Sequence, residues 1–347
     1  MLKAATGYVA GIYLLLALWS GAVCAQQANP EDEAIDAIRQ FTDFGAGDQR
    51  RIGEWVEAEV KKFNGFTAFR DRFKGQYGDS TNSPQFRLQL TTQTARVAAE
   101  RFARPDLNAD VAHALAQVLT DMNRAETFPG LMAGLKSSDA RARYLCVKGL
   151  IAQRRSIAAD KAKLDQTVEA LREAGLVELS PVVLGRIYQA LAYTGQVSTV
   201  FDAYLSVFDK RLDQRRGIAV IADGAEIYAY EFFRTSAVLG ALDAAQKSQL
   251  ANRLAVFLRM DAERYNSPGL QFDEIDKIER MLWILEEIFE ELVGGGKGGD
   301  IREVLQSGGF TERASILKEA YRWVGNPETN ESGALNEAPW NIPSGAP

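Results

Sequence analysis

The sequence contains a single histidine, His113, among its 347 residues. Catalytic triads and most zinc sites need a histidine next to a cysteine, an acid or a serine, and no second histidine or neighbouring cysteine accompanies this one. His113 follows two positions after Val111, so helical spacing turns it away from the apolar stripe of Val111, Leu115, Val118 and Met122. We therefore expect His113 to be an exposed surface residue, and we expect no catalytic residue, no metal site and no cofactor.

Cysteine is nearly as scarce, and one of the two, Cys24, lies in a segment with the pattern of a signal peptide. Lys3 supplies a positive start, residues 12–19 form an apolar core too short to span a bilayer comfortably, and small residues follow up to Ala25. We expect residues 1–25 to be cleaved off after Ala25 and the protein to be secreted or periplasmic. Lipidation of Cys24 is the alternative, but the Gly-Ala-Val before it resembles a lipoprotein signal poorly.

Cleavage after Ala25 would leave Cys146 as the only thiol of the exported chain. One cysteine cannot form an internal disulfide, so the mature protein must be stabilised by packing alone. Within the run RYLCVKGL we expect Cys146 to be a small buried apolar residue.

An excess of positive charge is also missing. The chain has 40 basic and 46 acidic residues, a net charge of −6, whereas nucleic-acid binders carry a basic stripe. With 46% hydrophobic residues the composition is that of a folded globular protein. The alternating pattern of strands is absent, and apolar residues recur at steps of three and four almost everywhere. The sequence thus predicts an all-α protein that does not bind nucleic acid and has no membrane span after signal cleavage.

The predicted helices come in pairs. The second helix of successive pairs begins near residues 109, 139 and 181, at intervals of roughly 30 to 40 residues, which is typical of helical-repeat arrays. Asn108 and Ser180 are placed to cap second helices, Pro181 suits a first helical turn, and Gly195 suits a helix end. The segment 74–84, rich in Gly, Ser, Asn and Asp, is the clearest linker.

The clearest pair spans residues 127–155. Thr127 can cap its first helix so that Pro129 falls in the first turn, and Asp139 or the preceding serines can cap the second helix. Arg143 lies at the edge of an apolar stripe, from which it could reach a carbonyl or an acid of the adjacent repeat. A second stripe of smaller residues, including Gly149, would permit close approach of a neighbouring helix.

This segment resembles a HEAT repeat. Pro129, Asp139, Arg143 and the run YLCVKGL occupy the places of the early proline, the acidic turn, the arginine and the alanine-and-leucine run of that family, although Ser137 aligns with the usual turn aspartate. The resemblance implies a right-handed superhelix of antiparallel helix pairs, less regular in the C-terminal half. An irregular bundle or an α/α toroid is the alternative there.

The domain organisation expected on this basis has four parts. Residues 1–25 form the signal peptide, 26–85 a helical segment with its linker, 86–325 the HEAT-like repeat domain, and 326–347 a polar, proline-dotted, disordered tail. In the last third we expect a helix with both sides apolar, around residues 275–292, to be sandwiched between neighbours.

Three acidic or glycine-rich features could carry chemistry. Asp223, Glu226 and Glu231 lie among aromatics, which suits sugar binding and glycoside hydrolysis, although helical packing explains them equally well. The acids between 273 and 291 favour a solvated face, since a helical di-metal site needs histidine. The run GGGKGG at 294–299 follows a helix instead of a strand, so we interpret it as a flexible hinge and not as a phosphate-binding loop.

Two functions follow as hypotheses. The first is an exported, non-enzymatic interaction or scaffold protein whose partner is another protein, because stacked repeats create extended binding surfaces without catalytic groups. The alternative is an α/α-toroid-like enzyme that acts on cell-envelope or extracellular carbohydrate through the acids near 223–231. The two differ in closure, since a toroid brings its first and last repeats together and a solenoid keeps them apart.

Overall fold

The computed structural model describes residues 30–216, 223–294 and 296–343. The regular elements in these ranges are all helices, and an isolated β-bridge joins Asn326 to Glu331. The prediction of an all-α protein is confirmed. The predicted signal peptide, with Cys24, lies outside the described residues. No helix within the described ranges is both long and apolar enough to cross a membrane.

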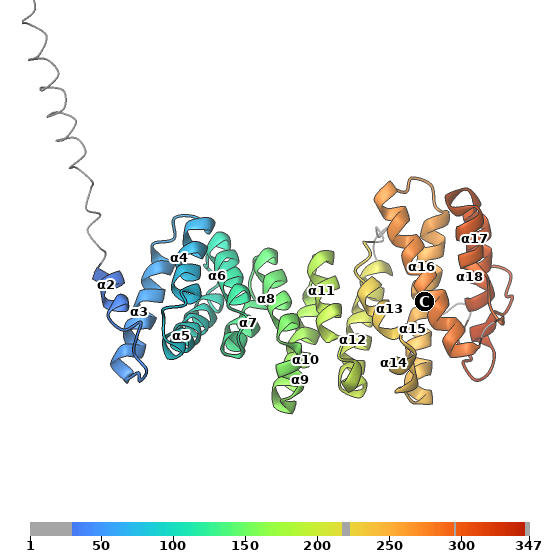
Figure 1. Ribbon diagram of the computed structural model, residues 1–347. Coiled ribbons are helices and arrows are strands. Elements are labelled where there is room, and N and C mark those ends of the chain that lie inside the picture. The colour runs from blue at the N-terminus through green and yellow to red at the C-terminus, as the bar shows by residue number, and fades with distance from the viewer. Residues whose placement is uncertain (1–29, 217–222, 295, 344–347) are drawn as a thin grey trace, which may run out of the picture.

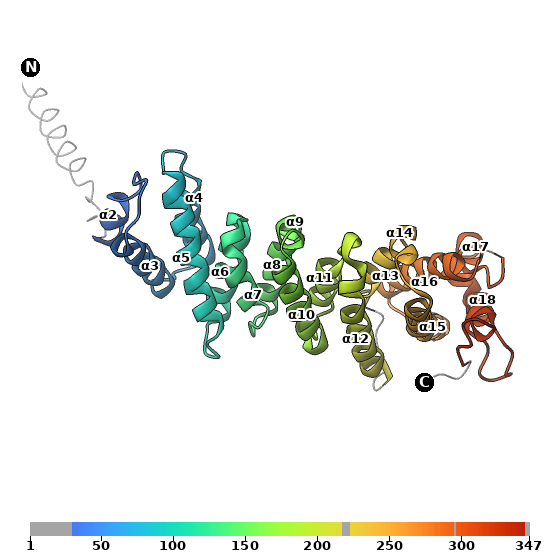
Figure 2. The same cartoon turned by 90° about the horizontal axis from the view of Figure 1, so that it is seen from below.

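The helices form pairs that stack in two rows, seen as an extended array in Figures 1 and 2. The first-row helices are α3 (Ala46–Lys61), α5 (Pro84–Phe102), α7 (Phe128–Gly134), α10 (Lys161–Val177), α12 (Val197–Arg216), α15 (Ala244–Asn266) and α18 (Arg313–Val324). The second-row helices are α4 (Phe66–Gly78), α6 (Ala109–Met122), α8 (Ala140–Ala152), α11 (Pro181–Leu191), α13 (Ile227–Phe233) and α16 (Phe272–Val293). Shorter helices are α9 (Arg154–Ala158), α14 (Ser236–Gly240) and α17 (Ile301–Ser307).

Contacts run along each row from one pair to the next. In the first row α5 packs on α7, α10 on α12 and α15 on α18, and in the second row α6 packs on α8, α8 on α11 and α13 on α16. Both views place α2 (Pro30–Asp36) and α18 at opposite ends of the array. The described chain is therefore open and does not close into a ring.

The beginnings of the second helices match the sequence prediction. α6 begins at Ala109, α8 at Ala140 and α11 at Pro181. The Asn108 side chain accepts hydrogen bonds from the first-turn N–H groups of α6, and the Asp139 side chain accepts one from Ala142. Side-chain oxygens satisfy N–H groups that a helix start leaves without partners, which fixes these boundaries locally.

Two predicted caps are not formed as expected. Ser180 has the extended backbone of a capping residue, but its side chain makes no cap bond, and its N–H donates to Glu178 instead. Thr127 precedes α7, and Pro129 lies in the first turn as predicted, yet the Thr127 hydroxyl donates to the Arg124 carbonyl. Backbone geometry and proline, and not a side-chain cap, therefore mark these two helix starts.

The predicted linker 74–84 is shorter than expected. Helix α4 continues to Gly78, because Phe73 is buried and the Tyr77 hydroxyl donates to the Met122 carbonyl. Only residues 79–83 connect α4 to α5. Since α3 packs on α5 and α4 on α6, both rows already begin before the boundary predicted at residue 85.

Two helix ends also differ from the prediction. α11 ends at Leu191 and not at Gly195, which lies in a short 3₁₀ turn, Thr194–Gln196. The spacing of the apolar residues between 225 and 239 predicts one helix, but the structure has two, α13 and α14, with extended backbone at Thr235 between them. Residue type alone did not mark these ends, because neither break coincides with a glycine or proline.

The C-terminal segment corrects the predicted disordered tail for residues 326–343. Leu335 and Ile342 are buried, and the Asn336 side chain donates to the carbonyl of Val324 at the end of α18. These apolar residues are scattered among polar ones without helical spacing, so the pattern gave no sign that they cover the last helix. Residues 344–347 lie outside the described part.

The core confirms two packing expectations. α16 is buried on two sides, through Ile278, Leu282 and Phe289 as well as Met281 and Ile284. The small residues of the 127–155 pair allow close approach, as expected. A Cβ added at Gly149 would lie 2.7 Å from a methyl group of Leu131, and one at Gly134 would lie 2.2 Å from Cys146 Sγ.

This close approach predicts that Gly134→Ala lowers the free energy of unfolding by about 1–2 kcal/mol in urea denaturation, because the core cannot take an added methyl group. Gly195→Ala is the matched control, since nothing lies within 4 Å of its Cβ position. In a Cys146→Ala background the cost of Gly134→Ala should fall. An unchanged cost there would show that the α7–α8 contact is not the cause.

Candidate interaction surface

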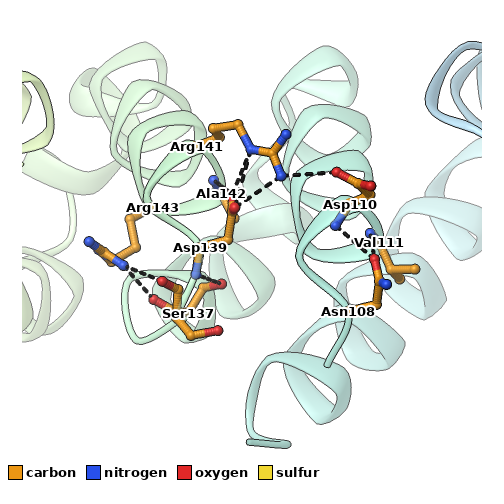
Figure 3. A network of polar contacts seen from close by, with 9 residues as sticks. Asn108, Asp110, Val111, Ser137, Asp139, Arg141, Ala142 and Arg143 are labelled. Carbon is orange, nitrogen blue, oxygen red and sulfur yellow. Dashed lines mark hydrogen bonds and ion pairs between the residues drawn. The ribbon is translucent and has the colours of Figure 1, made fainter. Parts of the chain in front are cut away.

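Arg143 connects two neighbouring pairs of the array. Its guanidinium donates from Nε to Glu178 Oε2 at 2.7 Å and from Nη2 to Glu178 Oε1 at 2.8 Å. Its Nη1 donates to the carbonyls of Ser137 and Ser138, the inward contacts visible in Figure 3. The prediction that Arg143 reaches a carbonyl or an acid of the adjacent repeat is confirmed by the acid Glu178, whereas the two carbonyls belong to the helix pair of Arg143 itself.

Glu178 is held as a carboxylate in a nearly closed environment. Its side chain is 1% exposed, and it also accepts hydrogen bonds from the N–H groups of Leu179 and Ser180. Burial opposes ionisation, but Arg143 and these N–H groups outweigh it and keep the pKa of Glu178 below its ordinary value. The contact between α8 and the α10–α11 turn is therefore a paired and hydrogen-bonded ion pair.

The Asp139 side chain binds Arg141 and the N–H of Ala142, both on its own helix. Its carboxylate caps α8 through Ala142 and accepts from Arg141, while Arg141 Nη2 also reaches Asp110 of α6 at 3.0 Å (Figure 3). The connection between the α6 and α8 pairs is thus Asp110–Arg141, and both of these side chains are largely exposed. Exposed ion pairs contribute little to stability.

The acids near 223–231 are neutralised by arginines. Arg211 of α12 binds Asp223 at 2.8 Å and Glu226 at 2.6 Å, whereas Glu231 binds Arg234 and Arg280 elsewhere. Glu226 is fully buried, and although burial opposes it, Arg211 keeps its pKa low. A glycosidase needs an accessible pair of carboxyl groups, one of them protonated. This arrangement does not favour the carbohydrate-hydrolysing alternative.

A second buried ion pair lies beside the first. Arg215 Nη2 contacts Asp261 Oδ1 at 2.6 Å, and both side chains are at most 3% exposed. Burial raises the pKa of Asp261 to about 6, against the attraction of Arg215. The sequence gave no signal for this pair, because its members lie 46 residues apart and only the packing of α12 on α15 joins them.

His113 is half-buried, so its predicted exposure is wrong. Its ring stacks on Phe66 of α4 at 4.7 Å between centroids, and burial, followed by the charge of Arg141, lowers its pKa. The side of α6 that looked free in the sequence is covered by the neighbouring second-row helix. Cys146 is fully buried, as predicted, and burial raises its pKa.

Two acids of α16 form buried, partnered contacts, whereas Asp273, Asp276 and Glu291 are exposed, as predicted for a solvated face. Glu274 binds Arg264 through two hydrogen bonds, and Glu286 accepts from Arg302 and from the N–H of Ile301. Both carboxylates are nearly inaccessible. In the described part of the chain no three acidic, histidine or cysteine side chains are placed to hold a metal ion.

The end of the glycine-rich run is packed, which corrects the interpretation as a flexible hinge for Gly298 and Gly299, whereas nothing lies within 4 Å of a Cβ added at Gly294 or Gly296. A Cβ at Gly298 would lie 2.2 Å from the Trp323 ring, and one at Gly299 would lie 2.0 Å from the Glu319 carbonyl. The glycines therefore allow the backbone to lie directly on α18.

Two hollows among the described residues are lined by residues other than the acids expected of the alternative enzyme. One of about 570 Å³ lies beside the C-terminal segment and is lined by residues such as Lys297, Arg322 and Trp340. Another, of about 350 Å³, carries Asp276 and Glu279 next to α17, and Glu279 accepts a hydrogen bond from Tyr265. Neither includes residues 223–231.

Sequence reasoning missed a set of aromatic and cationic contacts along the second row. The guanidinium of Arg186 on α11 lies 5.3 Å from the ring centre of Tyr144 on α8 and 5.8 Å from that of Tyr228 on α13. Close packing at Gly185 admits the Tyr228 ring, whose atoms would be 3.1 Å from an added Cβ. The three residues come from three different helices, so no local sequence motif predicts that they meet.

Exposed apolar side chains adjoin this set. Val177 at the end of α10 is 75% exposed, Leu179 in the α10–α11 turn is 84% exposed, and Val182 in the first turn of α11 is 65% exposed. We use the name arginine–tyrosine surface for Tyr144, Arg186 and Tyr228 together with Leu179 and Val182.

Comparison of the chain with protein-family models, curated proteins and solved structures finds no significant match. The fold and the paired charges by themselves define the class: an extended all-helical protein in which each buried acid of the described residues is paired with an arginine.

Proposed function

We propose that the protein is an exported, non-enzymatic interaction or scaffold protein built from HEAT-like repeats, arranged as a right-handed superhelix. The observation that carries the proposal is the open array of two rows, in which each pair packs on the next and leaves a long side of helices uncovered. Stacked helix pairs present extended surfaces for protein partners.

Three further features support the proposal. The second helices begin at Ala109, Ala140 and Pro181, at intervals in the range of helical repeats. Arg143, at the place of the family's arginine, bridges consecutive pairs. The acids that could have served hydrolysis are paired with arginines, as at Arg211.

Export predicts a defined start of the mature chain. When the full-length protein is produced in a bacterium and the periplasm is separated from the cytoplasm, we expect mass spectrometry to find a periplasmic chain that begins at Gln26. A chain that keeps its first residues in the cytoplasm would contradict export. A lipid-modified Cys24 at the N-terminus would instead support anchoring.

The interaction function is tested by cross-linking and affinity capture of the mature protein from its own exported proteome. We expect a specific protein partner whose cross-links map to one side of the array. Hydrolysis of a polysaccharide that is lost in Asp223→Ala or Glu226→Ala, measured with variants shown to be folded, would contradict the non-enzymatic proposal.

A further inference from the structure

We propose that Arg186 anchors a docking site for a protein segment that carries an aspartate or glutamate flanked by apolar side chains. The site is the arginine–tyrosine surface. The inference rests on the proposed interaction function and deepens it by naming the surface and the chemistry of its partner.

The first argument is that Arg186 lacks the partner that comparable arginines have. Its Nη1 donates to the side chain of Gln189 on the same helix, while no carboxylate among the described residues pairs with it. Five other buried or half-buried arginines are bound to an acid: Arg143, Arg211, Arg215, Arg264 and Arg302. Half-buried Arg124 and Arg154 also have no acid among the described residues, but each contacts one aromatic ring, whereas Arg186 lies between two. Arg186 therefore offers an uncompensated charge in a chain whose net charge is −6.

The second argument is that Arg186 is already positioned. Tyr144 and Tyr228 flank it from the two neighbouring helices of the row, so the rings restrict its rotamers before any ligand arrives. Ring contacts engage the faces of a guanidinium and leave the in-plane N–H donors for hydrogen bonds. A carboxylate matches such a pair of parallel donors, and preorganisation lowers the entropy cost of binding.

The third argument is that exposed apolar side chains lie next to Arg186. Val182 lies one helical turn before Arg186, and Leu179 stands in the preceding turn, both mostly exposed. Lys148, one turn after Tyr144 on α8, is exposed and has no acidic partner among the described residues. An occupant that satisfies all of these has a carboxylate for Arg186, a second acid for Lys148, and apolar side chains for Val182 and Leu179.

A nucleic acid fits this surface less well. Two uncompensated cations provide few phosphate contacts, and the overall charge of the protein repels a polyanion. The border of Leu179 and Val182 would also remain exposed against a phosphate backbone.

The experiment selects binders from a display library of random twelve-residue peptides against the mature protein, Gln26–Pro347. We expect enriched peptides to carry Asp or Glu beside apolar residues. For a synthetic copy of an enriched peptide, Arg186→Gln should weaken binding by roughly tenfold or more, because a charged two-point hydrogen bond is lost. Replacing the peptide's acid by its amide should weaken binding similarly, and should add little in the Arg186→Gln protein.

Two variants sharpen the test. Arg172→Gln on first-row helix α10 is the matched control, since Arg172 pairs with Glu169 away from this surface, and its binding should be unchanged. Arg186→Lys keeps the charge but not the planar fork, so it should bind with intermediate affinity. Circular dichroism establishes that each variant is folded.

The outcomes separate the inference from the function on which it rests. Enriched peptides that bind the Arg186→Gln protein as well as the wild type, or that carry no acid, would overturn the docking site and leave the interaction function standing. Failure to enrich any peptide would count against both. Tighter binding of a labelled single-stranded oligonucleotide, with loss in Arg186→Gln, would overturn the choice of a protein partner.

Discussion

Replacing Arg215 by Met is expected to lower the free energy of unfolding at pH 7 by about 3–5 kcal/mol, because it leaves the Asp261 carboxylate buried without its counter-charge. The side chain of Asp261 is fully buried, and its Oδ2 has no hydrogen-bond partner among the described residues. Methionine fills much of the space of the arginine stem, so the loss reports the unpaired charge more than a cavity. Urea denaturation followed by circular dichroism measures it.

The pH dependence follows from the pKa of Asp261, which burial raises to about 6 from an ordinary value of 3.8. Between pH 4 and pH 6 the folded protein holds a proton on Asp261 that the unfolded chain has lost, so this group makes stability fall as pH rises. Without Arg215 the carboxylate is harder still to ionise. The loss in Arg215→Met should therefore be smaller at pH 5 than at pH 7, by about 1 kcal/mol.

The double variant Arg215→Met/Asp261→Asn provides the control for this argument. It removes both charges, so it should be more stable at pH 7 than Arg215→Met alone, and its stability should vary less between pH 4 and pH 6. A double variant less stable than the single one would contradict the assignment of the loss to the buried carboxylate.

Arg143→Met is the second large effect, with an expected loss of about 3 kcal/mol, because it removes the cation that satisfies nearly buried Glu178. Two backbone N–H groups still donate to Glu178 in this variant. The loss of stability is therefore smaller than for a buried carboxylate without any hydrogen-bond donor. The matched control is Arg141→Met, two residues away on the same helix. Its ion pair with Asp110 is exposed, so its loss should cost far less stability than that of Arg143.

The stability of Arg143→Met should also depend on pH in a different way at low pH. The pKa of Glu178 is held below its ordinary value, so its contribution to stability is present above pH 4.5 and is lost as the pH falls through the lower pKa of the folded state. In Arg143→Met that pKa should rise, and the variant should lose less stability than the wild type on acidification. Equal effects of Arg143→Met and Arg141→Met at pH 7 would contradict the role of Arg143 as the bridge between pairs.

Features encoded within a few residues could be read from the sequence. Asn108 and Asp139 act as caps because a capping side chain bonds to the N–H groups two or three positions later. The starts of α6 and α8 follow from such local chemistry, and Pro181 marks the start of α11. The reach of Arg143 could also be predicted, because its place at the edge of a stripe directs it to the next pair.

Features that depend on a distant segment could not be read in this way. His113 is covered by Phe66 from α4, and Glu226 is buried because Arg211 arrives from α12. The sequence shows the charge of an acid but not its counter-charge, so a buried ion pair and an exposed acidic site look alike. The contacts of Arg186 with Tyr144 and Tyr228 could not be predicted for the same reason, because the two tyrosines come from the helices on either side.

The C-terminal segment shows a further limit of periodicity. Leu335 and Ile342 are buried, although the residues between 326 and 343 form little regular structure. Hydrophobic spacing detects helices and strands, whereas a segment that covers a helix end with single apolar residues has no period.

Small-angle X-ray scattering of the monomeric protein beginning at Gln26 tests the open array of helix pairs most directly. A compact globule of this length would have a radius of gyration of about 20 Å. The open array predicts a value well above this, with a pair-distance distribution skewed toward long distances. A radius near 20 Å with a symmetric distribution would show a closed or globular arrangement of the helices, and would contradict the extended surface on which the proposed function depends.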